Sequence, residues 1–188
     1  VACALRVDYD APRRYKQLRD LLGAGRLTDI DHFLLDDATY SNRLQNDLRH
    51  PDRTVGEGDR FGYDYRTVRC EVAADGVVRY RSDRWTAEFG ASVGRCVVRR
   101  RGFYEKELFP GAGSYGGSSR LRFTPYALRA SAGYAFSSRS YLEISASASA
   151  AVPDVEDLFL QPLYNNRTVD DPSLSRRYGA ELGFVRTG

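Results

Sequence analysis

The sequence predicts an all-β chain whose strands form a segment of an antiparallel transmembrane β-barrel. From about Phe61 onward, apolar and polar residues alternate with a period of two, which is typical of strands that present different faces to different surroundings. The apolar positions are rich in Ala and are bounded by aromatic residues. Short turns also alternate with long connections, as they do in barrels of the outer membrane.

Composition limits the alternatives. The 188 residues contain no apolar run of the roughly 18 residues that a transmembrane helix needs, so a helical membrane protein is excluded. The chain has no Met, and Val1–Leu5 carries neither a charged start nor an apolar signal core, which predicts an internal piece of a longer protein. The 28 basic and 25 acidic residues are interleaved, an arrangement that argues against a nucleic-acid partner.

The sequence also predicts the exposure of one arginine run and the state of the cysteines. Arg99-Arg100-Arg101 is interpreted as a solvated strand end. Cys3, Cys70 and Cys96 are odd in number and lack CxxC spacing, so unpaired thiols are expected, with one disulfide between two of them as the alternative.

Residues 1–59 are predicted to form a structured barrel loop with short helices. Asp10 can cap a helix that has Pro12 in its first turn, carries Tyr15, Leu18, Leu21 and Leu22 on one side, and stops at Gly23. Thr28 can cap a second helix through Ile30, Phe33 and Leu34. A third is expected from Asp37 to His50, because Pro51 ends it.

Residues 60–188 are predicted to be the barrel strands. The alternation is clearest in four segments, with two shorter strands expected before them and a turn at Ala74-Asp75-Gly76 between those two. The expected strands cover 62–72, 76–81, 85–94, 126–136, 141–150 and 178–184.

Two features favour a membrane wall over a soluble sheet. Tyr126 and Tyr134 end one apolar stripe and lie about 26 Å apart at roughly 3.3 Å per residue, close to the ~25 Å apolar band of a barrel. The apolar stripes consist largely of Ala, whereas a soluble core favours bulky side chains. The turns at Ser82–Arg84 and Ser137–Ser140 are short, and the connections at 99–120 and 152–176 are long.

Two stretches resemble a known family. Val152-Pro153-Asp154-Val155-Glu156-Asp157-Leu158-Phe159, then Asp171-Pro172-Ser173-Leu174, then Arg177-Tyr178-Gly179-Ala180-Glu181-Leu182-Gly183-Phe184 resemble the late-barrel signature of TonB-dependent receptors. Asp157, Asp171, and Arg176 or Arg177 depart from that pattern. The stretch from Leu44 to Tyr65 is similar to a loop and strand found in a subset of these receptors.

The resemblance implies part of a 22-stranded barrel in the bacterial outer membrane. The plug domain, the remaining strands and the terminal aromatic strand are not in this sequence. The implied function is uptake of a scarce solute, such as a ferric siderophore, haem, cobalamin, a glycan or a peptide. The implied partners are outer-membrane lipid, a TonB-type energising protein that acts through the missing plug, and a possible surface lipoprotein. No catalysis, cofactor or metal is expected. Candidate solute contacts in the loops are Tyr104, Tyr115, Tyr164 and Asn165.

The alternatives are a small soluble or surface-exposed β-rich binding module and, third, an enzyme built on a barrel. Gly111–Gly116 spells GxGxxG, but Pro110 precedes it and a strand is expected after it, so it is interpreted as a flexible loop. The group Asp29, Asp31, His32, Asp36 and Asp37 fits neither EF-hand nor zinc spacing. No Ser lies on a nucleophile elbow, so neither His32 nor His50 is expected to act as the base of a hydrolase. The glycosylation sequon at Asn166 has little meaning in a bacterial protein.

Overall fold

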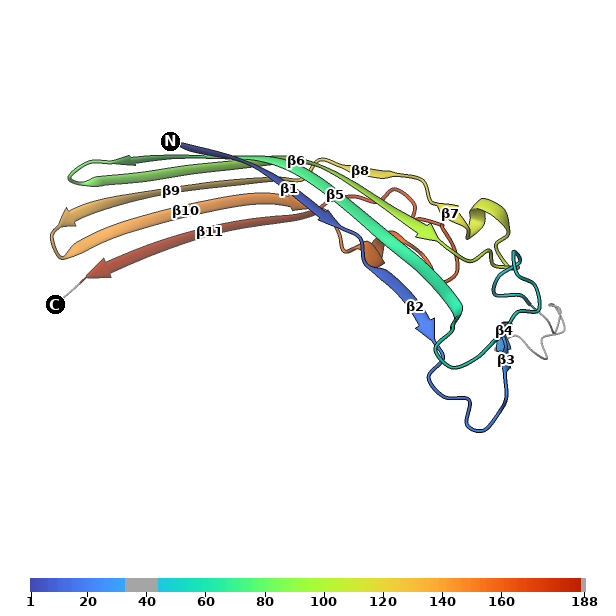
Figure 1. The fold of residues 1–188 in the computed structure, drawn as a ribbon. Helices are drawn as coiled ribbons and strands as arrows, with labels where there is room; N and C mark the ends of the chain where they lie inside the picture. The colour runs from blue at the N-terminus through green and yellow to red at the C-terminus, as the bar shows by residue number, and fades with distance from the viewer. Residues whose placement is uncertain (33–43, 187–188) are drawn as a thin grey trace.

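The described residues form one large curved antiparallel sheet of nine strands, with a cap of packed loops and a second, two-stranded sheet at one end (Figure 1). The computed structural model describes residues 1–32 and 44–186. The main strand order is β1-β5-β6-β9-β10-β11, so β1 and β11 form the two edges of an open sheet. The all-β antiparallel prediction is confirmed.

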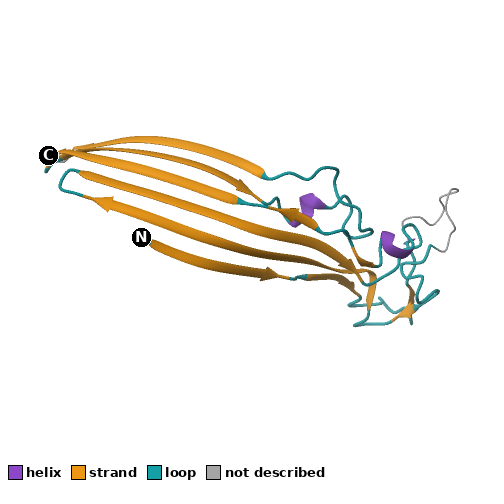
Figure 2. Ribbon diagram, turned by 90° about the horizontal axis from the view of Figure 1, so that it is seen from above, coloured by secondary structure: helices purple, strands orange, loops and turns teal. Residues whose placement is uncertain are grey.

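The strands differ greatly in length. Two long ones, β5 (Arg60–Arg81) and β6 (Trp85–Gly102), run from the short turns into the loop cap (Figure 2). Shorter strands pair with the outer edges of these two long strands. β1 and β2 pair with β5, and β9, β8 and β7 pair with β6. The remaining bounds are β1 (Ala2–Asp10), β2 (Arg13–Gln17), β3 (Leu27–Thr28), β4 (Thr54–Val55), η2 (Gly111–Gly113), β7 (Gly116–Gly117), β8 (Leu121–Phe123), β9 (Tyr126–Ser137), β10 (Ser140–Ala151), η3 (Val155–Leu158) and β11 (Ser175–Arg186).

The strand register brings the apolar stripes together on one side of the sheet, called here the outer face. Phe89 pairs with Ala130, and Ala130 pairs with Ala146 on the next strand. The stripes therefore line up across the sheet, because directly paired residues point to the same side. The outer face holds Leu5, Val7, Ala74, Val78, Trp85, Ala87, Phe89, Ala91, Val93, Tyr126, Leu128, Ala130, Ala132, Tyr134, Leu142, Ile144, Ala146, Ala148, Tyr178, Ala180, Leu182 and Phe184.

The outer face has no covering layer within the described part of the chain. Phe89 and Ile144 lie on interior strands of the sheet, and yet they are 51% and 55% exposed. Side chains of this size are normally buried in a soluble domain. The sheet is therefore a single layer over most of its length.

The opposite side, called here the inner face, is polar where the outer face is apolar. Glu88 pairs with Arg79 and Ser131, and Ser131 pairs with Ser145. Toward the loops this face becomes covered, and the buried apolar cluster of the protein lies there. The cluster consists of Cys96, Val98, Phe123, Val152, Leu158 and Phe159.

The helical prediction near the N-terminus is wrong where it can be compared. Residues 2–10 and 13–17 form β1 and β2, so the predicted loop over 1–59 starts later than expected. Leu22 is 91% exposed and its φ is 51°, so Leu22 and Gly23 end no helix. The apolar spacing was helical, but pairing with β5 determines the structure, because tertiary contacts override local propensity.

The two later helices can be compared only in part. Leu27–Thr28 pairs with Thr54–Val55, Ile30 forms a bridge with Gln45, and His32 lies in a 3-10 turn. Residues 44–50 contain the bridge residue Gln45 and a turn, so the described end of the third predicted helix is not helical. Phe33 and Leu34 and the start of the third helix lie outside the described residues.

The turn predicted at Ala74-Asp75-Gly76 is also wrong. These residues lie in the middle of β5, where Asp75 pairs with Ala4 on one side and Ser92 on the other. A strand with hydrogen-bonded neighbours on both sides stays extended even where the sequence contains Asp and Gly. The predicted strands at 85–94, 126–136, 141–150 and 178–184 are confirmed, and the first continues to Gly102.

Candidate functional site at the loop end

The long connections meet at one end of the sheet and pack into a polar cap. The segments involved are 29–32, 44–62, 103–118 and 152–174. The cap buries several charged side chains, which include Asp29, Asp47, Asp64, Arg100 and Lys106. Charges are buried in this way only when they have partners.

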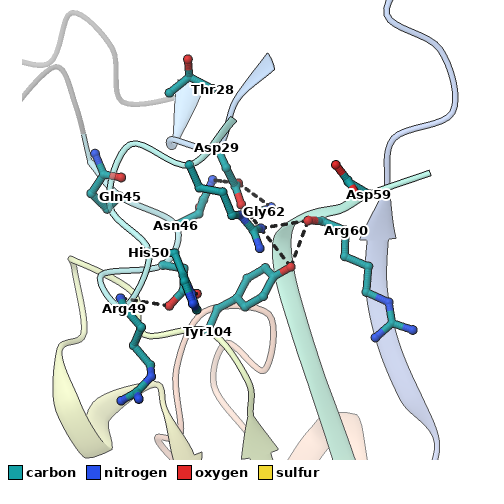
Figure 3. Close-up of polar contacts among 12 residues, drawn as sticks. Thr28, Asp29, Gln45, Asn46, Arg49, His50, Asp59, Arg60, Gly62 and Tyr104 are labelled. Carbon is teal, nitrogen blue, oxygen red and sulfur yellow. Dashed lines mark hydrogen bonds and ion pairs between the residues drawn. The ribbon is translucent and has the colours of Figure 1, made fainter. Parts of the chain in front are cut away.

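Asp29 is the centre of the first buried network. Its side chain is 1% exposed and accepts hydrogen bonds from Asn46 Nδ2 at 3.0 Å and the Gly62 amide at 2.8 Å. Arg53 forms an ion pair with the same carboxylate and also donates to the Tyr104 hydroxyl at 3.0 Å. Figure 3 shows Tyr104 directed at the Arg60 carbonyl, which accepts its hydroxyl proton at 3.0 Å.

Lys106 ties a second loop to this network. Its ammonium donates to Asn46 Oδ1 at 2.7 Å and to the Gly62 carbonyl, and it lies 5.6 Å from the centre of the Tyr164 ring. No carboxylate lies within ion-pair distance of it among the residues that the structure describes. Burial therefore lowers the pKa of Lys106 to about 8, although Asp29, Asp31 and Asp47 oppose the shift.

This pKa predicts a pH-dependent stability. The unfolded chain keeps the Lys106 proton up to about pH 10.5, whereas the folded chain releases it above about pH 8. The unfolded state therefore binds more protons in this window, and the free energy of unfolding should rise with pH by up to roughly 3 kcal/mol. From pH 8 to 10.5, we expect the free energy of unfolding of the wild type to rise relative to that of Lys106→Met. A constant difference across that range would contradict the assignment.

On the inner face, Arg100 connects the loop at 103–118 to the loop at 152–174. It is 2% exposed and donates to the Pro162 carbonyl at 2.6 Å, the Ser114 carbonyl at 3.1 Å and Asn166 Oδ1 at 2.5 Å. Asn166 in turn donates to the Ala112 carbonyl at 2.9 Å. The expectation of a solvated strand end at Arg99–Arg101 is wrong for Arg100, which points into the cap, while its two neighbours point to the outer face.

Two further carboxylates hold the periphery of the cap. Asp64 accepts two hydrogen bonds from the Arg13 guanidinium, from Nε at 2.7 Å and from Nη2 at 2.6 Å, which fastens β2 to β5. Asp47 accepts the Glu105 amide at 3.1 Å and pairs with His50 Nδ1 at 2.8 Å. The cap is therefore a platform in which these charged groups hold the loops and strands together.

A hollow of about 310 Å³ opens beside this platform. Tyr164 and Tyr63 supply aromatic surface, and Lys16 and His32 supply polar groups. Such a combination of ring faces and a few polar groups is typical of small-molecule sites. The full lining is Lys16, Ile30, Asp31, His32, Asn46, Phe61, Gly62, Tyr63 and Tyr164.

The four predicted solute contacts lie in different surroundings. Tyr164 lines the hollow, and Tyr115 is 38% exposed with Arg49 stacked 4.6 Å from its ring centre. Tyr104 is buried in the Asp29 network. Asn165 is 2% exposed and bonds to Gln161 and Arg167 of its own loop. The structure does not gather the four residues in one place.

The motifs considered for other chemistry are accounted for locally. Asp29 is engaged by Arg53, and Asp36 and Asp37 lie outside the described residues. Within residues 1–32 and 44–186, no group of three or more metal-ligating side chains comes together. The GxGxxG stretch forms the short helix η2 and leads into β7. The three cysteines are free thiols.

No helix in the described residues is both long enough and apolar enough to cross a membrane.

Comparison with known proteins identifies no relative. No protein-family model matches the chain, and no curated protein or solved structure gives a significant match.

The sequence does not predict that Arg53, Arg100 and Lys106 are buried in the cap. Arg53 and Lys106 look like ordinary surface charges, and Arg100 lies in a run of three arginines that predicts a solvated strand end. One usable signal was that Lys106 is one of only two lysines, with Lys16, among 28 basic residues.

Proposed function

We propose that this chain is part of the barrel wall of a bacterial outer-membrane transporter of the TonB-dependent class, which takes up a scarce solute. The observation that supports it most strongly is the uncovered outer face. A sheet that exposes a continuous apolar surface on one side and a polar surface on the other suits a boundary between lipid and water.

The aromatic residues on this face fit the proposal. At the short-turn end, the Trp85 ring lies 4.7 Å from that of Tyr134, which lies 5.0 Å from that of Phe136. At the loop end, Tyr126 and Tyr178 occupy the outer face. Aromatic residues prefer the two interfaces of a membrane, and the positions between the two rows are mostly Ala, Leu and Ile.

The connections at the two ends of the sheet also fit the proposed barrel wall. The short-turn end has tight connections at Ser82–Arg84 and Ser138–Arg139, whereas the opposite end holds the packed cap. In this class of protein, the long loops face the outside and meet the solute. We propose that the hollow lined by Tyr164 makes the initial contact with the solute.

Fluorescence of the only tryptophan tests the proposal. Trp85 is 53% exposed and sits at one edge of the apolar band. In vesicles with brominated lipids, we expect its emission to be quenched most by bromine near the headgroups. In a Trp85→Phe background, Phe89→Trp should be quenched best by bromine near the bilayer centre, and Ser92→Trp on the inner face should be quenched little.

The soluble binding module predicts a different result. Its single tryptophan would be insensitive to brominated lipid, and the protein would stay monomeric without detergent. Either observation would overturn the membrane proposal.

A further inference from the structure

The only two lysines of the chain meet at the hollow in the cap. Lys16 lies on β2 and lines the hollow directly. Lys106 comes from the loop at 103–118, and its ammonium contacts Asn46, Gly62 and Tyr164. All three of these residues line the hollow, so the charge of Lys106 lies immediately behind its wall.

The charge of Lys106 is only partly compensated. An ammonium group has three hydrogens to donate. Among the residues that the structure describes, Asn46 Oδ1 and the Gly62 carbonyl accept two of them, and the third direction offers only the Tyr164 ring, centred 5.6 Å away. Lys106 is 5% exposed, so water screens its charge little, and its attraction for an anion extends into the hollow.

Lys16 can contact a solute directly. Its ammonium lies 4.5 Å from the centre of the Phe61 ring, and it forms no ion pair with any residue in 1–32 or 44–186. The ring holds the ammonium at the surface of the hollow, and the charge stays available to a bound anion.

The charges around the hollow leave a positive excess. Asp31 lines the hollow and opposes one of the two lysines. Asp29 lies behind the wall and is balanced by its ion pair with Arg53. With His32 counted as neutral, two lysines face one unbalanced carboxylate. The described lining therefore suits a solute that carries one negative charge.

The rings of the hollow suit the rest of such a solute. Lys16 covers the face of Phe61, whereas Tyr63 and Tyr164 line the hollow and are half-buried. Two aromatic side chains in a space of about 310 Å³ suit a small molecule with a flat, apolar body.

We propose that the hollow binds a solute with one carboxylate group on a flat ring, and that it prefers this solute to a neutral one of the same shape. The carboxylate lies beside the Lys16 ammonium, and the ring lies against Tyr63 and Tyr164. This inference rests on the proposed function and deepens it, because it specifies the chemistry of the solute that the hollow meets first.

Benzoate and benzamide test the preference, because they share a ring and differ by one negative charge. The full chain is labelled with 13C-lysine and kept in a non-ionic detergent. The Cε signals of its two lysines are followed by NMR during titration with each probe at pH 7. Lys16→Arg assigns the two signals and keeps the charge. We expect benzoate to shift both signals and to bind about ten-fold more tightly than benzamide.

Three variants locate the charges that matter. Lys16→Gln should weaken benzoate binding about three-fold, as expected for an exposed ion pair. Lys106→Met should weaken it about ten-fold, because the lost charge is screened less. Neither should change the affinity for benzamide. Arg186→Gln removes one charge at the short-turn end of the sheet and should bind like the wild type. An equal loss in Arg186→Gln would show a general charge effect and overturn the assignment.

The protonation of Lys106 gives a test that needs no substitution. Asp29, Asp31 and Asp47 favour its charged form. Burial and Arg100 favour the neutral form, and the pKa of Lys106 is about 8. Benzoate binding should therefore weaken about seven-fold from pH 7 to 9.5, and saturating benzoate should raise this pKa by about 1, since the two effects are linked. An unchanged pKa would contradict a role for Lys106.

The remaining outcomes separate this inference from the proposed function. Equal affinity for benzoate and benzamide would leave the hollow as a site for rings and overturn the carboxylate. No shift of either lysine signal with either probe would overturn both the carboxylate and the assignment of first solute contact to the hollow. Trp85 quenching by brominated lipid tests the membrane wall independently, so a failure there is distinguishable from a failure at the hollow.

Discussion

Replacement of Gly102 by Ala is expected to release the loop cap from the sheet. A Cβ atom on Gly102 would lie 1.8 Å from the Ser114 carbonyl oxygen and 2.8 Å from a nitrogen of the Arg100 guanidinium. The first of these is a backbone atom, so no side-chain rotation relieves the clash. The loop must move, and Arg100 then loses its buried acceptors.

The expected cost is about 3 kcal/mol in the free energy of unfolding, at the upper end of what overpacking usually costs. Denaturant unfolding in detergent micelles measures it, and limited proteolysis within 103–118 and 152–174 reports the release of the cap. Gly117→Ala is the matched control, because Gly117 lies on the neighbouring strand with nothing within 4 Å of a new Cβ. Similar behaviour of the two variants would contradict the role of Gly102.

The strands of the sheet could be predicted because their signal is local. Alternation along 126–136 and 141–150 with a four-residue turn determines both the strands and the side to which each residue points. Alternation by itself fits both a two-layered soluble sheet and a single-layered wall, so it does not determine that the outer face is uncovered. What alternation does not contain is the register between strands, and the register places Arg66 opposite Arg101.

The N-terminal strands could not be predicted in this way. Tyr15, Leu18 and Leu22 have helical spacing, and Pro12 suits a first helical turn. The deciding contacts are distant in sequence: Arg13 binds Asp64, and β1 pairs with residues of β5 that lie 59 to 75 positions later. Such pairing partners are not visible in a window of a dozen residues.

The buried cap residues lay beyond sequence reasoning for a related reason. Arg100 stands between two outward-facing arginines, and only its inward direction in β6 and the arrival of the 152–174 loop make it structural. Their positions in the loops predict solute contacts for Tyr104 and Asn165. Packing of separate loops buried both of them instead.

A charge placed at the middle of the outer face tests the central claim most directly. Ala130 pairs with Phe89 and Ala146, midway between Tyr126 and Tyr134, whereas the next residue, Ser131, pairs with Glu88 and Ser145 on the inner face. Ala130→Arg and Ser131→Arg therefore add the same side chain one position apart, to opposite sides of one strand.

In lipid vesicles, we expect Ala130→Arg to lower the free energy of unfolding of the membrane-inserted protein by about 2–4 kcal/mol, because its charge would lie in the acyl region. Ser131→Arg should leave it nearly unchanged, since Glu88 and water surround that position. Denaturant unfolding of both variants in the same vesicles gives the two values. Equal costs for both variants, or a larger cost for Ser131→Arg, would contradict a lipid-facing outer surface.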